Sequence, residues 1–496
     1  MKIFIGSRIK EADRYTIENE PVSSVDLMER ASEAIAGWIS RNIERQTPLL
    51  FVIGKGNNGG DGMAVARILR QQGFDCSVYF ACGRDFAAEE CRINLERLPA
   101  DVRVIDCLAE TDRHALIVDA LLGTGISGNV REPLAGIIAS INSLSNKVIS
   151  IDLPSGMSTE PQYPDCDTKP CCIVKADITL TLEFPKLSMM TPEAGEFAGK
   201  IIILPAGLSE QYLEQTETPY HYIDKTLVDR LLKKRSKFGY KNMYGHTLII
   251  GGSRNMIGAA VLATSAALRS GSGLVSAHIP YKERFALQTA CPSAILSFDT
   301  AEYFSGLPCD LDKYNAIGTG CGWGMRQETL NAFAALLKTV ECPLTVDADA
   351  LNLLALNKNL WKHIPENSVL TPHFGELKRL TGGWSNAIDR EKKIMRLAAE
   401  TGAPVVVKGA HTAVYLPDGN VFFNSTGNSG MAKGGSGDVL TGLIAGLLAR
   451  GYSGFEAATL GVYFHGLAGD CACRKYGCES MNSFDIVNEL RIEQAT

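Results

Sequence analysis

The chain has 496 residues and a formal net charge of -6, with 45% hydrophobic and 21% charged residues. This composition is ordinary for a globular protein, and the mild acidic excess argues against nucleic acid or an anionic membrane as a partner. At about 150 residues per domain, the length predicts two or three domains.

Targeting signals are missing from the sequence pattern. No stretch approaches the roughly 18 uninterrupted apolar residues of a membrane span, and the N-terminus lacks the apolar run and small-residue cleavage site of a signal peptide. We therefore predict a cytoplasmic protein whose 14 cysteines are reduced. For the neighbouring Cys471, Cys473 and Cys478 we predict buried structural thiols, with half of a metal site as the alternative.

The N-terminal part alternates short apolar runs with helical patterns. Apolar runs predict strands at 48–54, 75–82, 114–125 and 147–156. Helical spacing predicts helices at 63–73 and 133–144. Such βαβ units imply a parallel sheet with right-handed crossovers, so we predict an α/β fold with a Rossmann-like three-layer domain at this end of the chain.

The loop "GKGNNGGDG" at 54–62 joins the first predicted strand to the first predicted helix. Asn and Asp tolerate unusual backbone angles and also offer side-chain oxygens. Asp119 ends a later strand and Ser155 follows another, and together such oxygens suit a cation. Turn chemistry is the alternative explanation for the same residues. Asp152, three residues before Ser155, is a candidate for proton transfer.

Four segments resemble the NAD(P)H-hydrate epimerase family, over residues 10–215 approximately: "LMERA" (27–31), "GKGNNGGDG", "VDALLGTGISG" (118–128) and "IDLPSGM" (151–157). The resemblance implies a Rossmann-like fold that uses K⁺, held by Asn58, Asp119 and Ser155. It also implies that Asp152 contacts the substrate, where we expect it to transfer the proton. The other residues that it places against the hydrate are Asn57, Asn58, Gly59, Gly60, Asp61, Gly123, Thr124, Gly125, Ile126, Ser127, Gly128 and Asn129.

The apolar pattern thins at 205–226, which is polar and has no long apolar run. We interpret this segment as a linker with the domain boundary near residue 218. The predicted domains are therefore 1–217 and 218–496.

A second α/β series follows the predicted linker, with a strand at 246–252 and a helix at 258–271. Further apolar runs each enter a turn that carries Gly, Asp or His: "GLVSAHIP", "NAIGTGCG", "CPLTVDAD", "NSVLTPHFGE" and "PVVVKGA". Ligands of open parallel sheets bind beyond the carboxyl ends of the strands, so these turns predict one ligand cleft.

The glycine-rich segment "GNSGMAKGGSGD" (427–438) precedes a helical pattern that continues through Leu448. The first N–H groups of a helix lack partners and its dipole is positive there, and glycines let that backbone approach phosphate oxygens. A carboxylate at Asp438 could accept a hydroxyl proton during phosphoryl transfer. The alternative is an Asp helix cap after a flexible turn. No P-loop motif is present, but ribokinase-like enzymes place a glycine-rich anion hole and an Asp base in this way.

Several segments in this order resemble the ADP-dependent NAD(P)H-hydrate dehydratase family, a ribokinase-fold group: "GAAVLATSAALRSGSGLV", "IGTGCG", "TPHFGE", "VVVKGAHT" and "GNSGMAKGGSGD". The resemblance runs from Lys225 to the end of the chain. It implies that Ala260, Gly320 and His373 line the site of the hydrated nicotinamide and that Asp438 contacts the hydrate and acts as base. The implied nucleotide-binding residues are Lys408, Gly409, Ala410, His411, Thr412 and Gly437.

This sequence departs from the dehydratase pattern at two places. Phe374 stands where the family usually has Pro, and "GTG" (318–320) stands for a "GPG"-like turn. For His373 a purely structural role remains an alternative.

Both halves resemble families that act on the same substrate, and the whole chain resembles the bifunctional NAD(P)H-hydrate repair family. The resemblance implies epimerisation of R- and S-NAD(P)HX and dehydration of the S form with ADP and Mg²⁺, giving AMP and phosphate. We expect NADHX, NADPHX and ADP as small-molecule partners, a homo-oligomer, and no nucleic acid or membrane. The alternative is a ribokinase-like kinase of a small alcohol, such as a vitamin precursor, whose N-terminal half only binds a nucleotide or a protein partner.

Overall fold

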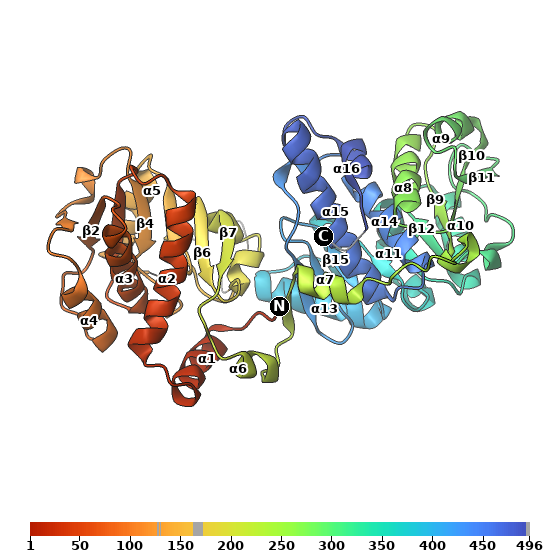
Figure 1. The fold of residues 1–496 in the computed structure, drawn as a ribbon. Helices are drawn as coiled ribbons and strands as arrows, with labels where there is room; N and C mark the ends of the chain where they lie inside the picture. Colours follow the sequence, from red (N-terminus) through yellow and green to blue (C-terminus); the bar gives the residue numbers. More distant parts are fainter. Residues whose placement is uncertain (126–127, 129, 162–171, 493–496) are drawn as a thin grey trace. The chain divides into compact units, whose positions relative to one another are not determined.

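The computed structural model describes residues 1–125, 128, 130–161 and 172–492 (Figure 1). Contacts divide the chain into two compact units. The N-terminal unit comprises Lys2–Thr218 and Asn386–Ile388, and the C-terminal unit comprises Met1, Pro219–Ser385 and Asp389–Thr496. None of the helices in the described ranges combines the length and the apolar character that a membrane crossing requires.

The N-terminal unit contains a seven-stranded sheet in the order β3-β2-β1-β4-β5-β6-β7, with every neighbouring pair parallel. Its strands are β1 (Leu49–Ile53), β2 (Cys76–Phe80), β3 (Arg103–Val104), β4 (Leu116–Ala120), β5 (Val148–Ile151), β6 (Ile178–Leu182) and β7 (Lys200–Leu204). The order of its first six strands is that of the Rossmann fold, so the predicted fold is confirmed.

Helices cover both faces of this sheet, which is why its central strands are apolar throughout rather than alternating. The helices of the unit are α1 (Gly6–Asn19), α2 (Ser24–Asn42), α3 (Asn57–Gln71), α4 (Glu89–Arg97), α5 (Leu134–Ser143) and α6 (Glu210–Gln215). Phe51 and Val118 pack with α2 and α3 on one face, while Val52 and Ile117 pack with α5 on the other.

The C-terminal unit contains a ten-stranded sheet in the order β11-β10-β9-β12-β13-β14-β15-β16-β17-β8. Its strands are β8 (Tyr220–Ile223), β9 (His246–Ile250), β10 (Leu274–Pro280), β11 (Ile295–Asp299), β12 (Ala316–Thr319), β13 (Leu344–Val346), β14 (Val369–Leu370), β15 (Val405–Val407), β16 (Ala413–Tyr415) and β17 (Val421–Asn424). Strands from β11 to β15 pair in parallel, and only the β15–β16 and β16–β17 pairs are antiparallel among the described strands. The predicted parallel α/β core is confirmed, and the antiparallel hairpin is an addition that the sequence did not predict.

The helices of this unit are α7 (Lys225–Leu231), α8 (Ile257–Arg269), α9 (Arg284–Ala290), α10 (Gln327–Thr339), α11 (Ala348–Leu356), α12 (Phe374–Thr381), α13 (Ala387–Thr401), α14 (Ser436–Ala449), α15 (Gly454–Tyr476) and α16 (Ser483–Glu489). Helix α14 is almost wholly buried and packs against α8, α15 and the strands β9, β12 and β13. A helix that is apolar on all sides is expected in such a position.

The segment predicted as a linker, 205–226, is not a plain linker. It contains α6, strand β8 and the start of α7, and β8 pairs in parallel with β17 through Tyr220 and Val421. The interpretation as a plain linker was wrong because β8 is an edge strand of which only Ile223 is buried, whereas the predicted boundary near residue 218 coincides with the division between Thr218 and Pro219. Backbone hydrogen bonds rather than an apolar run therefore place it in the sheet.

Two of the cysteines predicted to be reduced form a disulfide in the structure. Cys473 and Cys478 are bonded, with their Cα atoms 4.7 Å apart, whereas ten other described cysteines are free. Cys471 is free and partly exposed, so neither the reduced nor the buried interpretation holds for the whole cluster. The two bonded residues bracket the C-terminal end of α15, where a five-residue separation brings them within reach.

Close packing of α14 on α8 gives the first prediction. A Cβ at Gly442 would lie 1.9 Å from the carbonyl oxygen of Ala263, whereas a Cβ at Gly258 of α8 would meet nothing within 4 Å. We expect Gly442→Ala to destabilise the C-terminal unit by about 1–3 kcal/mol, because the backbones of α8 and α14 cannot move apart unless the side chains around them repack. Scanning calorimetry measures the effect, and Gly258→Ala should be neutral or stabilising as the matched control. Equal transition temperatures for the two variants would contradict the packing described.

Candidate active sites

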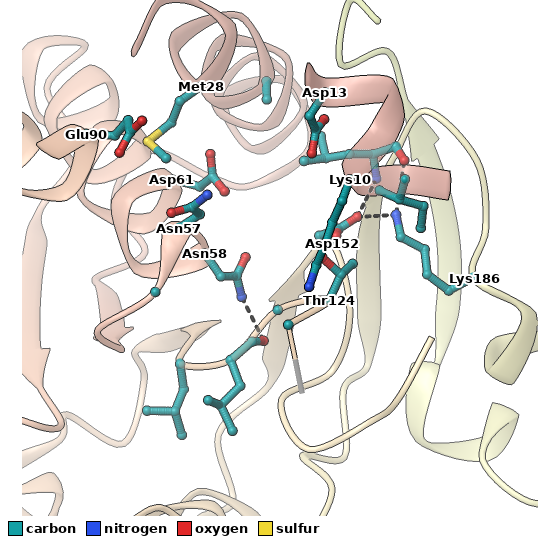
Figure 2. A pocket seen from close by; sticks show the side chains of 18 of the residues that line it. Lys10, Asp13, Met28, Asn57, Asn58, Asp61, Glu90, Thr124, Asp152 and Lys186 are labelled. Atoms are coloured by element: carbon teal, nitrogen blue, oxygen red, sulfur yellow. Dashed lines mark hydrogen bonds and ion pairs between the residues drawn. The ribbon is translucent and has the colours of Figure 1, made fainter. Parts of the chain in front are cut away.

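A cavity of about 1070 Å³ lies in the N-terminal unit, at the carboxyl ends of β1, β4 and β5 (Figure 2). Parallel sheets place their ligands at this edge. The predicted site residues that line it are Asn57, Asn58, Asp61, Gly123, Thr124, Gly125, Gly128 and Asp152. The predicted residues Ile126, Ser127 and Asn129 lie outside the described residues. The cavity therefore gathers segments that the sequence holds more than 60 residues apart, as the Asn58–Leu122 hydrogen bond illustrates.

The glycines of "GKGNNGGDG" serve packing as well as access. Helix α3 begins at Asn57, inside the loop rather than after it. A Cβ at Gly59 would lie 2.0 Å from the carbonyl oxygen of Gly54, and one at Gly60 would lie 2.8 Å from the Sδ of Met28. Gly59 and Gly60 are buried in the first turn of α3, so these two predicted contact residues hold the helix against the strand end instead of lining the cavity.

Asp119 is buried and joins the loop after β4 to the loop after β5. Its Oδ1 accepts from the Ser155 hydroxyl at 2.5 Å, and its Oδ2 accepts from the Ser150 hydroxyl at 2.8 Å and the Ser155 N–H at 2.9 Å. Burial raises the pKa of Asp119, against the effect of these hydrogen bonds. The carboxyl group thus fixes the predicted ligand Ser155 in place.

The side-chain amide of Asn58, a predicted K⁺ ligand, is hydrogen-bonded at only one of its two ends. Its Nδ2 donates to the carbonyl oxygen of Leu122 at 2.9 Å. Its Oδ1 is buried and finds no hydrogen-bond partner among the described residues. An unsatisfied buried oxygen is costly, and a cation bound beside it would satisfy it. The oxygens of Asn58, Asp119 and Ser155 therefore fit a hard monovalent cation.

Asp152 follows β5 and adopts a left-handed backbone conformation, with φ of 62°. One of its carboxylate oxygens, Oδ1, accepts from the Leu182 N–H at 3.0 Å and from the ammonium group of Lys186. Lys186 is 1% exposed and also donates to the Thr181 hydroxyl at 3.0 Å. Sequence reasoning missed Lys186, because "FPKLSMM" carries no recognisable spacing for chemistry.

Two further acids share the cavity with Asp152. Asp13 comes from α1 and Asp61 from α3 (Figure 2). The surrounding protein and then the Asp152 charge raise the pKa of Asp13 to about 6, although the side chain opens to the cavity. The same causes raise the pKa of Asp61 well above its usual value. Asp13 was also missed, because it lies in a polar helix with no motif.

In the C-terminal unit, Asp438 lies in the first turn of α14, as the sequence predicts. The residue before the helix, Gly435, has φ of 92°, and a Cβ there would lie 2.5 Å from Leu262. Burial raises the pKa of Asp438 to about 6, and the nearby Asp347 charge adds to the effect, while the Cys321 thiol and Lys408 oppose it. A carboxyl group with such a pKa can exchange a proton near neutral pH.

Lys408 and Asp347 form a buried ion pair beside Asp438. The Lys408 Nζ lies 2.6 Å from Asp347 Oδ1 and 3.9 Å from the carboxylate of Glu376. Burial opposes the charge of Lys408, but Asp347 and Glu376 outweigh it and raise the lysine pKa. A Cβ at Gly437 would lie 3.3 Å from the Lys408 Nζ. The two predicted nucleotide-binding residues Lys408 and Gly437 therefore lie together, although they are 29 positions apart in sequence.

Thr441 completes the cluster from the second turn of α14. Its hydroxyl donates to Asp347 Oδ2 at 2.7 Å. Asp347 therefore receives one bond from Lys408, the residue after β15, and one from α14, and it holds the two segments at a fixed spacing.

His373 caps helix α12. Its Nδ1 accepts from the N–H groups of Gly375 at 2.9 Å and Glu376 at 3.3 Å, and the side chain is 53% exposed. His373 therefore has a structural role as a helix cap, and its Nε2 lies 3.3 Å from Glu376 Oε1; its predicted contact with the hydrate stays a prediction. His373 also bridges to Lys408 in the sheet.

The other predicted residues take different positions. Gly320 has φ of 104°, and a Cβ there would lie 1.9 Å from the Asp347 carbonyl oxygen. Ala260 is fully buried beneath the glycine turn at Gly251 and Gly252. Both therefore shape the backbone next to the Asp347 cluster.

The predicted nucleotide loop after β15 is a tight turn. Gly409 and Thr412 close it through their mutual hydrogen bonds at 3.1 and 3.3 Å, and Gly409 and Ala410 are exposed. The His411 ring lies 3.3 Å from the Asn424 carbonyl oxygen. Phe374, which departs from the dehydratase pattern, lies 3.6 Å from the Cβ position of Gly409, so an aromatic ring borders this loop.

Two family descriptions match the chain. Residues 247–491 match the family described as NAD(P)H-hydrate dehydratase, and residues 24–188 match the YjeF-related protein N-terminus. The matches lie in separate units of the structure.

Whole-length relatives carry one common description, bifunctional NAD(P)H-hydrate repair enzyme Nnr. The protein from Moorella thermoacetica is 33% identical over 99% of this chain and 96% of its own length. The proteins from Coxiella burnetii and Escherichia coli are 32% and 31% identical, again over 99% of this chain, and 99% and 93% of their own lengths are covered.

A solved structure also resembles the chain: the ADP/ATP-dependent NAD(P)H-hydrate dehydratase from Bacillus subtilis, co-crystallised with ATP/Mg²⁺. It is 28% identical, with a TM-score of 0.48, and the alignment covers 54% of this chain and 96% of that one.

The Asp347 cluster gives the second prediction. We expect Thr441→Val to destabilise the C-terminal unit by about 1–3 kcal/mol, because Asp347 Oδ2 loses a buried donor. Calorimetric unfolding measures it. Thr264→Val is the matched control, since the buried Thr264 hydroxyl has no hydrogen-bond partner among the described residues, and this substitution should be neutral or stabilising. A larger loss for Thr264→Val would refute the assignment.

Proposed function

The chain belongs to the family of bifunctional NAD(P)H-hydrate repair enzymes, and we propose that its two units divide the repair between them. The N-terminal unit is the epimerase of R- and S-NAD(P)HX, and the C-terminal unit dehydrates S-NAD(P)HX to NAD(P)H at the expense of ADP. The observation that carries the proposal is the placement of one carboxylate, Asp152 or Asp438, at the carboxyl-end edge of each parallel sheet.

The dehydration needs activation of a poor leaving group. Reduced nicotinamides gain water across the C5–C6 double bond, and hydroxide leaves C6 reluctantly. Asp438 accepts the proton of the C6 hydroxyl while the hydroxyl oxygen attacks the terminal phosphorus of ADP, and AMP leaves. The phosphate ester then departs with its C–O electron pair, and loss of a C5 proton restores the double bond.

The glycine-rich turn before α14 is suited to the nucleotide phosphates. Its helical N–H groups and the positive end of the helix dipole favour anions, and Lys408 adds a positive charge that Asp347 holds in position. We propose that Lys408, Gly409, Ala410, His411, Thr412 and Gly437 bind the nucleotide. Ala260, Gly320 and His373 shape the adjoining hydrate site.

Cations enter the two units differently in this proposal. K⁺ would be held by Asn58, Asp119 and Ser155, where it would stabilise the loops that contact the substrate. Within the described residues no three His, Cys, Asp or Glu side chains are grouped for a metal ion. We therefore propose that Mg²⁺ enters with the nucleotide phosphates, whose charge it neutralises. The homo-oligomer and the cytoplasmic location remain predictions.

The alternative function, a kinase of a small alcohol, shares the nucleotide turn and the base. Incubation with NADHX and ADP separates the two. Repair restores the near-ultraviolet absorbance of the reduced nicotinamide, whereas a kinase leaves a stable phosphorylated product and no absorbance.

The third prediction concerns Asp438. We expect Asp438→Asn to lower S-NADHX turnover by about 10²-fold or more, because the amide cannot accept the hydroxyl proton. In the unsubstituted enzyme, turnover should be present above a pH of about 6 and fall as the pH drops through the raised pKa of Asp438. Initial rates against pH measure both effects. Full turnover by Asp438→Asn would show that another group is the base.

The fourth prediction concerns K⁺. Replacement of K⁺ by tetramethylammonium should slow conversion of R-NADHX, which needs the epimerase, and leave S-NADHX conversion unchanged. The reason is that the predicted K⁺ ligands all lie in the N-terminal unit, where the buried Asn58 Oδ1 has no hydrogen-bond partner among the described residues. Coupled initial rates on the separated hydrates measure this, and equal effects on both hydrates would contradict the assignment of K⁺ to this unit.

A further inference from the structure

The epimerase cavity holds more titratable groups than the sequence motifs supply. Asp13 and Lys10 enter from α1, Asp61 from α3 and Asp152 from the end of β5, while Lys186 lies beside Asp152 (Figure 2). The other charged residues that line this cavity are Glu90, Arg131, Glu132 and Glu183.

Asp152 is held through one of its two carboxylate oxygens. Its Oδ1 accepts from both the Lys186 ammonium and the Leu182 N–H. No hydrogen bond reaches Oδ2 from the residues that the structure describes, so this oxygen is available to the cavity. Lys186 is held by Thr181 Oγ1 at 3.0 Å and Leu182 O at 3.1 Å, which fixes the direction of its ammonium group.

Asp13 differs from Asp152 because it has no counter-ion among the described residues. Its carboxyl group opens to the cavity and receives no ion pair or hydrogen bond from the described part of the chain. The surrounding protein and then the Asp152 charge favour the neutral form of Asp13, against the smaller effect of Lys186. A lysine-paired carboxylate beside a second carboxyl group without a counter-ion is an arrangement that suits acid–base catalysis.

We propose that Asp13 is the second catalytic residue of the epimerase, donating a proton as acid while Asp152 accepts one as base, and that Lys186 is a positioning residue for Asp152. This inference rests on the proposed epimerase function of the N-terminal unit.

The roles follow from the bonds that change at C6. Asp152 takes the proton of the C6 hydroxyl, the C6–O electron pair forms a carbonyl, and the C6–N1 bond breaks. The released electron pair goes to N1, which takes a proton from Asp13. Rotation about the C5–C6 bond presents the other carbonyl face, and the reverse steps close the ring. Both carboxyl groups return to their starting states, and no redox partner is required.

Asp13→Asn in the full chain tests the proposal, with initial rates on R-NADHX in the presence of ADP and subtraction of the reaction without enzyme. We expect at least a 10²-fold loss with unchanged S-NADHX turnover, and partial rescue by Asp13→Glu. The R-to-S interconversion by the unsubstituted epimerase, followed without ADP by separating the two epimers, should fall as the pH rises through about 6, because the acid must be protonated, and the residual activity of Asp13→Asn should not show this fall. Glu18→Gln, on the exposed side of the same helix, is the matched control.

The outcomes separate the inference from the function on which it rests. If the unsubstituted chain converts S-NADHX but never R-NADHX, the proposed epimerase function fails. If it converts R-NADHX and Asp13→Asn does so equally well, or if Asp61→Asn alone removes the alkaline limb, only the role of Asp13 is overturned. For Lys186, Lys186→Met should lower kcat for R-NADHX and Lys186→Arg should restore part of it, because Asp152 loses the ion-pair partner that directs its carboxylate. An unchanged kcat in a Lys186→Met variant that keeps its unfolding temperature would overturn the positioning role.

Discussion

A buried carboxylate that has to be satisfied organises each unit. Asp119 and Asp347 both end or follow central strands and are almost without solvent contact. A charge in such a place requires hydrogen bonds from several directions. Asp119 accepts them from the β5 strand and the loop after it, and Asp347 accepts them from the residue after β15 and from α14. The loops that carry the chemistry are therefore held to one another by the need to satisfy a charge.

Each unit places an acidic side chain at its candidate site, but the surroundings of that side chain differ between the units. In the N-terminal unit the acids face a cavity, and their protonation depends on neighbours such as Lys186. In the C-terminal unit the first turn of a buried helix supplies the N–H groups, and Lys408 supplies the positive charge. The kinase alternative would share this second arrangement, because a nucleotide phosphate needs the same cradle whatever accepts it. The family of the chain, and not the fold, favours repair.

Much of the fold follows from local patterns in the sequence. Apolar runs such as 48–54 and 246–252 are strands because helices bury them on both faces. Edge strand β8 was not predicted, since only Ile223 of it is buried. The β16–β17 hairpin was not predicted either, although its strands are buried, because they are only three and four residues long. Helix α3 begins earlier than its apolar spacing indicates, because glycines that favour loops elsewhere are required here by close packing against Gly54.

The candidate sites were predictable where residues sit in glycine-rich turns, as Asn58 and Asp438 do. Asp13 and Lys186 lie in ordinary sequence and become visible only when the fold brings them to Asp152. The disulfide between Cys473 and Cys478 was missed for another reason. The sequence shows the spacing but not the direction in which the chain turns after α15.

The backbone at Asp152 carries a further consequence. A left-handed conformation costs an ordinary L-residue about 1–2 kcal/mol, and somewhat less for aspartate. Glycine would relieve this strain, yet it would leave the buried ammonium of Lys186 without its counter-ion and the cavity without the base that we propose. The N-terminal unit is therefore less stable with Asp152 than it would be with a residue that favours this backbone conformation. This loss of folding free energy accompanies the presence of a carboxylate in the cavity.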